Sequence, residues 1–158
     1  MQPLTVLVVE DNPADFELLK CAFNRSGTNF RLGVARDGVE AQEYLLGTGK
    51  FRDRDEAPVP DLMLLDLHLP RRSGFEVLEW LRGQASSLKT LPVIVLTSSP
   101  ESKDVDRAYA LGANSYLVKE GEVGKMVAVV KSIAEYADVV VSGARPAASR
   151  RPKSERPG

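Results

Sequence analysis

The sequence predicts an α/β fold in which five parallel strands form one doubly wound sheet with helices on both faces. Three observations support this prediction. Short apolar runs alternate along the chain with segments of helical periodicity. The run "LMLL" is apolar without interruption, as in strands that are buried on both faces. The length of 158 residues suits one domain with a core of its own.

The predicted strands are short runs rich in Val, Leu and Ile. They lie at residues 4–9, 30–35, 62–66, 92–97 and 115–118. The crossovers between parallel strands are right-handed, and the first and third strands are neighbours where the strand order reverses. This gives the flavodoxin-like order 2-1-3-4-5, in which ligands bind beyond the carboxyl ends of the strands.

The predicted helices follow the strands and carry apolar residues at helical spacing. Pro13 suits the first turn of the first helix, and Asp37 suits the N-cap of the second. Gly47 and Gly112 suit the ends of the second and fourth helices. The predicted helices cover residues 13–24, 38–46, 74–82, 100–111 and 122–140, and the last has the clearest apolar stripe.

Two segments depart from this alternation. Residues 47–60 form a long charged connection, which we expect to be an exposed loop. Residues 142–158 contain three prolines and five basic residues but no apolar periodicity. We therefore expect one folded domain over residues 1–141 and a disordered basic tail. The tail has no DNA-reading motif, so direct DNA binding is not expected.

The composition argues against several classes of protein. Hydrophobic residues at 43% and charged residues at 27% are typical of soluble globular domains. No apolar run approaches the ~20 residues that span a bilayer, and the first residues lack the basic region of a signal peptide. We expect a cytoplasmic protein without membrane attachment. The single cysteine, Cys21, argues against a disulfide framework.

Polar and charged residues stand at the ends of four predicted strands. Glu10 and Asp11 follow the first strand, and Asp66 ends the third. Thr97 ends the fourth strand, and Lys119 follows the fifth. Because the carboxyl ends of parallel strands share one edge, these side chains should converge. Clustered carboxylates need a counter-charge, and a few oxygen ligands with room for water and a phosphate oxygen fit Mg²⁺ best.

This set of residues predicts phosphoryl chemistry at Asp66. The Asp66 carboxylate can act as a nucleophile and become an aspartyl phosphate. Lys119 would add positive charge beside the phosphoryl oxygens, and the Thr97 hydroxyl would donate to one of them. Each residue alone has an ordinary explanation, such as a helix cap or a solvated charge. Their joint occurrence at successive strand ends favours a common site.

Four segments resemble the receiver domain of two-component response regulators in their order and spacing. They are "VLVVEDNPADFELL", "DLMLLDLHLPRRSGFEVLEWL", "PVIVLTSS" and "GANSYLVKE", and the resemblance covers about residues 4–140. The "EDNPAD" start, the charged loop and "LDLHLPRRSG" look most like the stand-alone regulators that pair with bacterial phytochrome histidine kinases. The resemblance implies that a sensor histidine kinase phosphorylates Asp66 with Mg²⁺ as cofactor.

The resemblance also implies the metal ligands and the residues that tune phosphate hydrolysis. Asp11 would bind Mg²⁺ directly and Glu10 would hold metal-bound water. Asp66 and the backbone carbonyl of His68 would complete the protein ligands. The side chains of His68 and Ser99 occupy positions at which the family tunes hydrolysis.

Further implied roles concern the phosphoryl contacts and the switch. Thr97 and Lys119 would contact the phosphoryl group, and Tyr116 occupies the position of the aromatic switch that turns inward as Thr97 moves. One departure is Glu120, because the family usually has proline after the lysine, with a cis bond between them. Either the fold supports a cis bond without proline or the bond is trans.

The last predicted helix carries a second apolar row, which is either part of a broad core face or a homodimer surface. We favour the dimer, formed through helix 4, strand 5 and helix 5. The row consists of Val129, Ile133, Tyr136 and Val140.

Three alternative functions can be compared with the sequence. A haloacid-dehalogenase-like phosphatase also uses a strand-end Asp, but it needs a second Asp two residues later, where this chain has His68. A nucleotide- or flavin-binding protein needs a glycine-rich loop after the first strand, which is lacking here. A receiver-like adaptor that never takes phosphate is the third alternative.

Overall fold

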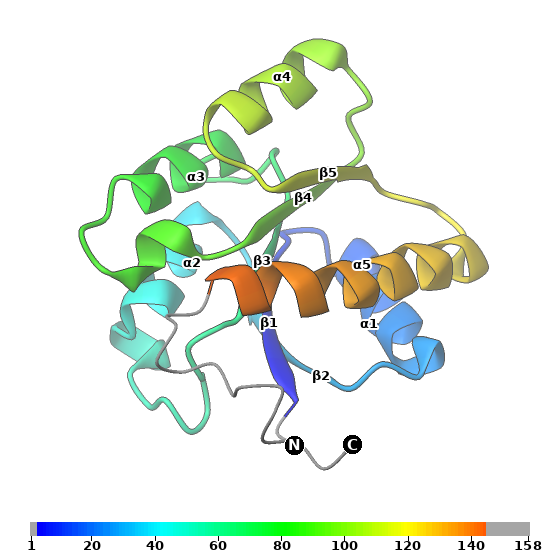
Figure 1. Cartoon of the computed structure of the whole chain (residues 1–158), viewed down its shortest axis with the longest axis horizontal. Helices are drawn as coiled ribbons and strands as arrows, with labels where there is room; N and C mark the ends of the chain where they lie inside the picture. Colours follow the sequence, from blue (N-terminus) through cyan, green and yellow to red (C-terminus); the bar gives the residue numbers. More distant parts are fainter. Residues whose placement is uncertain (1–2, 145–158) are drawn as a thin grey trace.

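The computed structural model describes residues 3–144, apart from the side chains of Val140 and residues 142–144. Five parallel strands form one sheet in the order β2-β1-β3-β4-β5, which confirms the predicted topology (Figure 1). The strands are β1 Leu4–Val9, β2 Phe30–Ala35, β3 Leu62–Leu65, β4 Val93–Thr97 and β5 Ser115–Val118.

Helices cover both faces of this sheet. Apolar residues of α1 and α5 pack on one face, and those of α2, α3 and α4 pack on the other (Figure 1). The helices are α1 Pro13–Ser26, α2 Gly38–Leu46, α3 Gly74–Arg82, α4 Ser102–Ala110 and α5 Val123–Ala144, with short 3₁₀ helices at Gly49–Phe51 and Ser87–Thr90.

The uninterrupted apolar run of β3 follows from this layering. Leu62 and Leu64 belong to the core beneath α1 and α5, whereas Met63 and Leu65 belong to the core beneath α2, α3 and α4. All four side chains are at most 1% exposed. Fully burying one such side chain contributes about 1.5–3 kcal/mol to stability. The third strand is therefore a central anchor for both layers.

Local capping residues start the helices close to the strand ends. The Asn12 side chain accepts hydrogen bonds from the first turn of α1, and Pro13 occupies its first position. The predicted cap Asp37 accepts from the Glu40 backbone N–H at 2.8 Å. Gly47 ends α2 in the left-handed conformation, with φ 69°. The caps at Asn12 and Asp37 keep the β1–α1 and β2–α2 loops at the carboxyl edge of the sheet short.

The charged connection of residues 47–60 differs from the expected exposed loop. It contains a short 3₁₀ helix and buries Phe51 and Ala57 against α2. The Arg54 guanidinium donates to the carbonyl groups of Tyr44 and Leu45 at 2.8 and 3.0 Å. The segment is thereby fixed to the C-terminal end of α2.

Helix α5 differs from the prediction in two ways. It continues past residue 141 to Ala144, and the tail from residue 145 onward lies outside the described residues. The prediction that Ile133 belongs to a dimer surface is wrong, because Ile133 is 1% exposed within the core. Val129 and Tyr136 are half-buried against the same core. The helix therefore presents one broad apolar face to the sheet.

The side chain of Val140, the last residue of the predicted dimer row, lies outside what the structure describes. Between residues 3 and 144, no helix is both long enough and apolar enough to cross a membrane.

Candidate functional site

The register of the sheet brings the predicted strand-end residues together. Val9 pairs with Leu65, so that the residues following them, Glu10 and Asp66, begin adjacent loops. The Asp66 backbone N–H donates to the Val9 carbonyl at 3.1 Å. On the other side, the Lys119 backbone N–H donates to the carbonyl of the last residue of β4 at 2.8 Å. Side chains from β1, β3, β4 and β5 thus share one edge.

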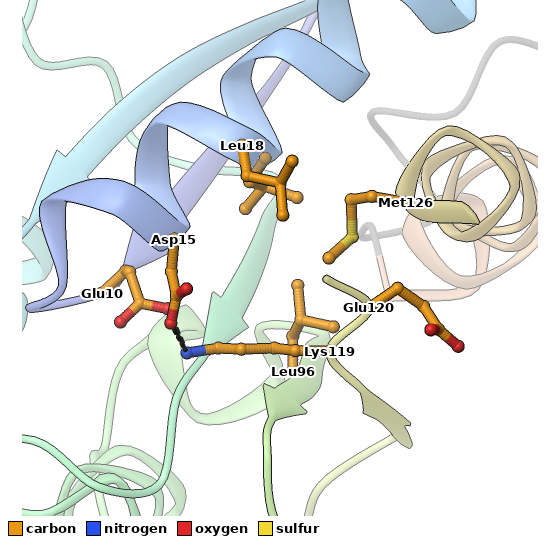
Figure 2. Close-up of a pocket in the computed structure, with 8 residues that line it drawn as sticks. Glu10, Asp15, Leu18, Leu96, Lys119, Glu120 and Met126 are labelled. Carbon is orange, nitrogen blue, oxygen red and sulfur yellow. Dashed lines mark hydrogen bonds and ion pairs between the residues drawn. The ribbon is translucent and has the colours of Figure 1, made fainter. Parts of the chain in front are cut away.

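Lys119 is the positive centre of this edge. Its Nζ lies 2.5 Å from Glu10 Oε1, 3.0 Å from Asp15 Oδ2 and 3.1 Å from Asp66 Oδ2. Figure 2 shows the lysine side chain extending from the end of β5 toward Glu10 and Asp15. Burial lowers the pKa of Lys119, but hydrogen bonds to Glu10 and Asp15 and the Asp66 charge raise it above its usual range. The ammonium therefore stays charged.

The lysine reaches this position without a cis peptide bond. No cis bond occurs between residues 3 and 144, so the Lys119–Glu120 bond is trans. The sequence leaves the cis and trans conformations open, and the structure has the trans conformation.

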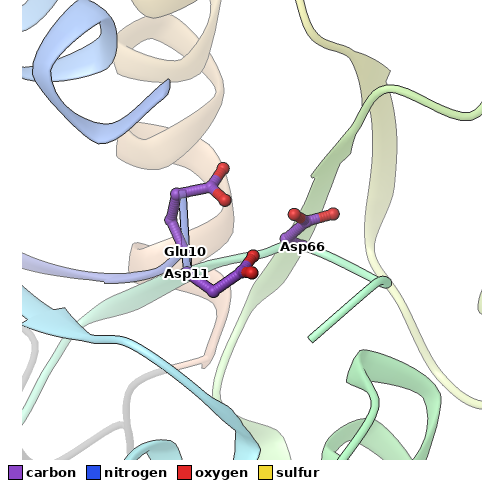
Figure 3. A group of neighbouring side chains, drawn as sticks. All are labelled: Glu10, Asp11 and Asp66. Carbon is purple, nitrogen blue, oxygen red and sulfur yellow. The ribbon is translucent and has the colours of Figure 1, made fainter. Parts of the chain in front are cut away.

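Three carboxylates form an acidic group beside the lysine. One oxygen from each of Glu10, Asp11 and Asp66 lies within 4.8 Å of the others (Figure 3). Glu10 and Asp66 are each 6% exposed, whereas Asp11 is exposed. Burial, and to a smaller extent the Asp66 charge, raise the pKa of Glu10 to about 7, although Lys119 opposes the rise. A hard divalent cation suits three clustered carboxylate oxygens with one open side.

Thr97 supplies an unsatisfied hydroxyl at the same edge. The residue is fully buried at the end of β4, and its Oγ1 has no hydrogen-bond partner in the part of the chain that the structure describes. A buried polar group without a partner costs about 1–3 kcal/mol. The hydroxyl is therefore suited to an oxygen-bearing ligand at this edge.

The loop that follows Asp66 is held close to the strand end. The His68 backbone N–H lies 3.4 Å from Asp66 Oδ1, and the His68 side chain is exposed. Gly74 packs so closely on the Asp66 carbonyl that a Cβ there would overlap it. The position of the His68 carbonyl as a metal ligand stays a prediction.

The β4–α4 loop is fixed from two sides. The Tyr116 hydroxyl donates to the Ser99 carbonyl at 2.7 Å, and the Ser99 hydroxyl donates to Asp104 at 2.6 Å. Burial is the main cause of the raised pKa of the half-buried Tyr116. The predicted switch residue thus contacts the loop that follows Thr97.

Two contacts near the site were not predicted from the sequence. Asp15, in the first turn of α1, is an ion-pair partner of Lys119. Its place in the first turn of a helix that starts directly after the Glu10–Asp11 strand end is the signal that could have indicated it. Arg71 pairs with Asp37 at 2.8 Å and holds the β3–α3 loop against the start of α2. No local pattern in the sequence indicates that second contact.

Known proteins are similar to this chain over most of its length. The family model of the response regulator receiver domain matches residues 6–131. Response regulator Rcp1 of Synechocystis sp. is 36% identical over 134 residues, which cover 85% of this chain and 88% of Rcp1.

Solved structures are similar over the same part of the chain. The phosphorylated cyanobacterial phytochrome response regulator RcpA is 36% identical with a TM-score of 0.75, and the match covers 85% of this chain and 93% of that one. The Mn²⁺-bound form of Rcp1 is 35% identical with a TM-score of 0.73, over 85% and 94% of the two chains. The chain belongs to the response regulator receiver domain family, whose members are signalling proteins.

Proposed function

We propose that Asp66 accepts a phosphoryl group from the phosphohistidine of a sensor histidine kinase. The observation that carries this proposal is the position of the Asp66 carboxylate, which belongs to the acidic group and lies 3.1 Å from Lys119 Nζ. An Asp66 oxygen forms a bond to phosphorus as the bond from phosphorus to the imidazole nitrogen breaks. The imidazole leaves with the electron pair of that bond.

The residues of the site fit Mg²⁺ as the cofactor. Glu10, Asp11 and Asp66 offer carboxylate oxygens, and the backbone carbonyl of His68 completes the proposed ligands. Bound Mg²⁺ would neutralise the charge that builds up on the phosphoryl oxygens. The Thr97 hydroxyl, which has no hydrogen-bond partner within residues 3–144, supports the presence of a further oxygen-bearing group at this edge. The Mn²⁺-bound form of the relative Rcp1 supports a divalent cation.

Thr97, Lys119 and Tyr116 would respond to the phosphoryl group. Lys119 holds positive charge beside Asp66, and the Thr97 hydroxyl donates to a phosphoryl oxygen. Movement of Thr97 displaces the β4–α4 loop, to which the Tyr116 hydroxyl is bonded through Ser99. Tyr116 then turns inward, which changes the surface of α4, β5 and α5.

The chain would also hydrolyse its own aspartyl phosphate. Water attacks phosphorus and the Asp66 carboxylate leaves, so the protein returns to its starting state without acting on another substrate. His68 and Ser99 tune the rate of this step. The exposure of the His68 side chain beside Asp66 supports such a role, as does the position of Ser99 in the loop after Thr97.

The proposed kinase is a phytochrome histidine kinase. The phytochrome response regulator RcpA, whose phosphorylated form is similar to this chain, supports this partner. A homodimer through α4, β5 and α5 is the proposed form of the signal. Each element exposes a large apolar side chain in support of it, namely Tyr109, Val118 and Val139 at 47%, 42% and 72% exposure.

Intact mass after incubation with acetyl phosphate and Mg²⁺ tests the proposal. We expect the wild type to gain ~80 Da, the mass of one phosphoryl group, and Asp66→Asn to gain nothing. An equal gain in the Asn variant would refute Asp66 as the acceptor. No gain in the wild type would favour an adaptor that never takes phosphate.

A further inference from the structure

Among the residues that the structure describes, Asp15 is the one partner of the Lys119 ammonium that lies outside the acidic group. Its Oδ2 lies 3.0 Å from Lys119 Nζ, although the residues come from α1 and from the end of β5 (Figure 2). The other two carboxylates that contact Nζ are Glu10 and Asp66, which both belong to the acidic group.

The capping of α1 does not use the Asp15 carboxylate. An acidic residue at the third position of a helix commonly closes a capping box, as Glu76 does in α3. In α1 the backbone N–H of the cap residue, Asn12, donates instead to Glu10 Oε2 at 3.2 Å. The Asp15 carboxylate is therefore available for Lys119.

This difference matters when a cation binds. A divalent cation bound by the acidic group offsets part of the negative charge of Glu10 and Asp66. Their attraction for the Lys119 ammonium therefore becomes weaker. Asp15 lies outside the acidic group, so its attraction for the Lys119 ammonium is not weakened. We infer that Asp15 is a positioning residue, which keeps the Lys119 ammonium beside Asp66 once the cation is bound. The inference rests on the proposed function, in which Lys119 contacts the phosphoryl group.

The lysine needs such a tether because its side chain is long and flexible. Its stem borders a small pocket between α1, β4 and α5, whose apolar walls include Leu18, Leu96 and Met126 (Figure 2). Apolar walls of this kind hold the methylene groups but do not fix the direction of the ammonium. An ion pair at the tip supplies that direction. The Asp15 side chain is 42% exposed, so its effect should be moderate.

The rate of Asp66 phosphorylation by acetyl phosphate at saturating Mg²⁺ tests the inference. We expect Asp15→Asn to slow phosphorylation roughly three- to tenfold. The matched control is Glu17→Gln, which removes the same charge from an exposed position of α1 and should leave the rate unchanged. In a Lys119→Gln background, Asp15→Asn should cause no further decrease. A wild-type rate in Asp15→Asn, or an equal decrease in both backgrounds, would overturn the inference.

A second measurement does not depend on phosphorylation. The ¹H–¹⁵N resonance of the Lys119 ammonium should persist in the wild type at saturating Mg²⁺, because the ion pair slows proton exchange. In Asp15→Asn with Mg²⁺ it should broaden beyond detection, and in Glu17→Gln it should persist. A sharp resonance in Asp15→Asn would overturn the inference. Failure of the wild type to take phosphate would instead refute the proposed function and leave this NMR test valid.

Discussion

Thr97 shows how a single residue of the site lowers stability in the absence of ligand. Its hydroxyl is fully buried at the end of β4 and is unpartnered within residues 3–144. In the proposed function this hydroxyl donates to a phosphoryl oxygen once Asp66 is phosphorylated. The unsatisfied hydroxyl therefore destabilises the unphosphorylated protein, and a substitution can remove this effect.

Thr97→Val should stabilise the unphosphorylated protein, because it replaces the unsatisfied hydroxyl with a methyl group. We expect the free energy of unfolding in urea to rise by about 1 kcal/mol. The matched control is Thr90→Val, since the Thr90 hydroxyl donates to the Ser87 carbonyl and its loss should not stabilise. A lower free energy of unfolding for Thr97→Val would contradict the claim that the Thr97 hydroxyl is unsatisfied.

At the scale of elements, the loop after Asp66 depends on contacts with the start of α2. Asp37 caps that helix with one carboxylate oxygen and accepts from Arg71 with the other. Arg71 itself has φ 63°, a left-handed conformation that a residue other than glycine adopts at a cost. The ion pair thus helps to hold a strained residue within the loop that follows Asp66.

This ion pair should make stability depend on pH. Burial raises the pKa of Asp37, but the Glu40 N–H and Arg71 outweigh it, so the pKa lies below its usual value. A lowered pKa means that the stabilisation is present at neutral pH and is lost as pH falls through the pKa of the folded state. Arg71→Gln should reduce the free energy of unfolding at pH 7 by roughly 1 kcal/mol.

Urea unfolding of Arg71→Gln and the wild type at several pH values measures this effect. The difference between them should begin to shrink below about pH 4, the usual pKa of an aspartate, and should vanish below the lower pKa of folded Asp37. Arg72→Gln is the control, because Arg72 bonds the neutral Gln42 side chain and its loss should have the same effect at each pH. A constant difference for Arg71→Gln would show that the ion pair with Asp37 is unimportant.

Buried and exposed residues of α5 should differ in their contribution to stability. Ile133 is 1% exposed, so Ile133→Ala should leave a cavity and lower the free energy of unfolding by about 2–5 kcal/mol. Val139 on the same helix is 72% exposed, and Val139→Ala should change stability by at most about 0.5 kcal/mol. Thermal or urea unfolding compares the two. Equal small effects would restore Ile133 as a surface residue.

For the whole molecule, the sequence predicts correctly the sheet and the convergence of strand-end residues at one edge. Each strand is a compact apolar run, and parallel pairing places every strand end at one edge, so Glu10, Asp66 and Lys119 could be brought together without coordinates. The contacts of Asp15 and Arg71 depend on the directions of long side chains across separate loops. Periodicity in a single sequence does not determine those directions.

The error at Ile133 has a different physical origin. Apolar residues on a helix predict a buried stripe, but they do not show how wide a face the sheet covers. The face of α5 that packs on the core includes Ile133 of the predicted dimer row as well as Val130. The width of that face is a property of the packed molecule.

The central claim is that residues distant in the chain form one cation-binding site at the carboxyl edge of the sheet. Paramagnetic broadening of backbone amide resonances by substoichiometric Mn²⁺ tests it most directly. We predict that the amides of residues 10–12, 66–68 and 97–99 broaden first, and that Asp11→Asn weakens the effect. Broadening that begins at another acidic segment, such as residues 53–56, or that spreads evenly over the protein would contradict the claim.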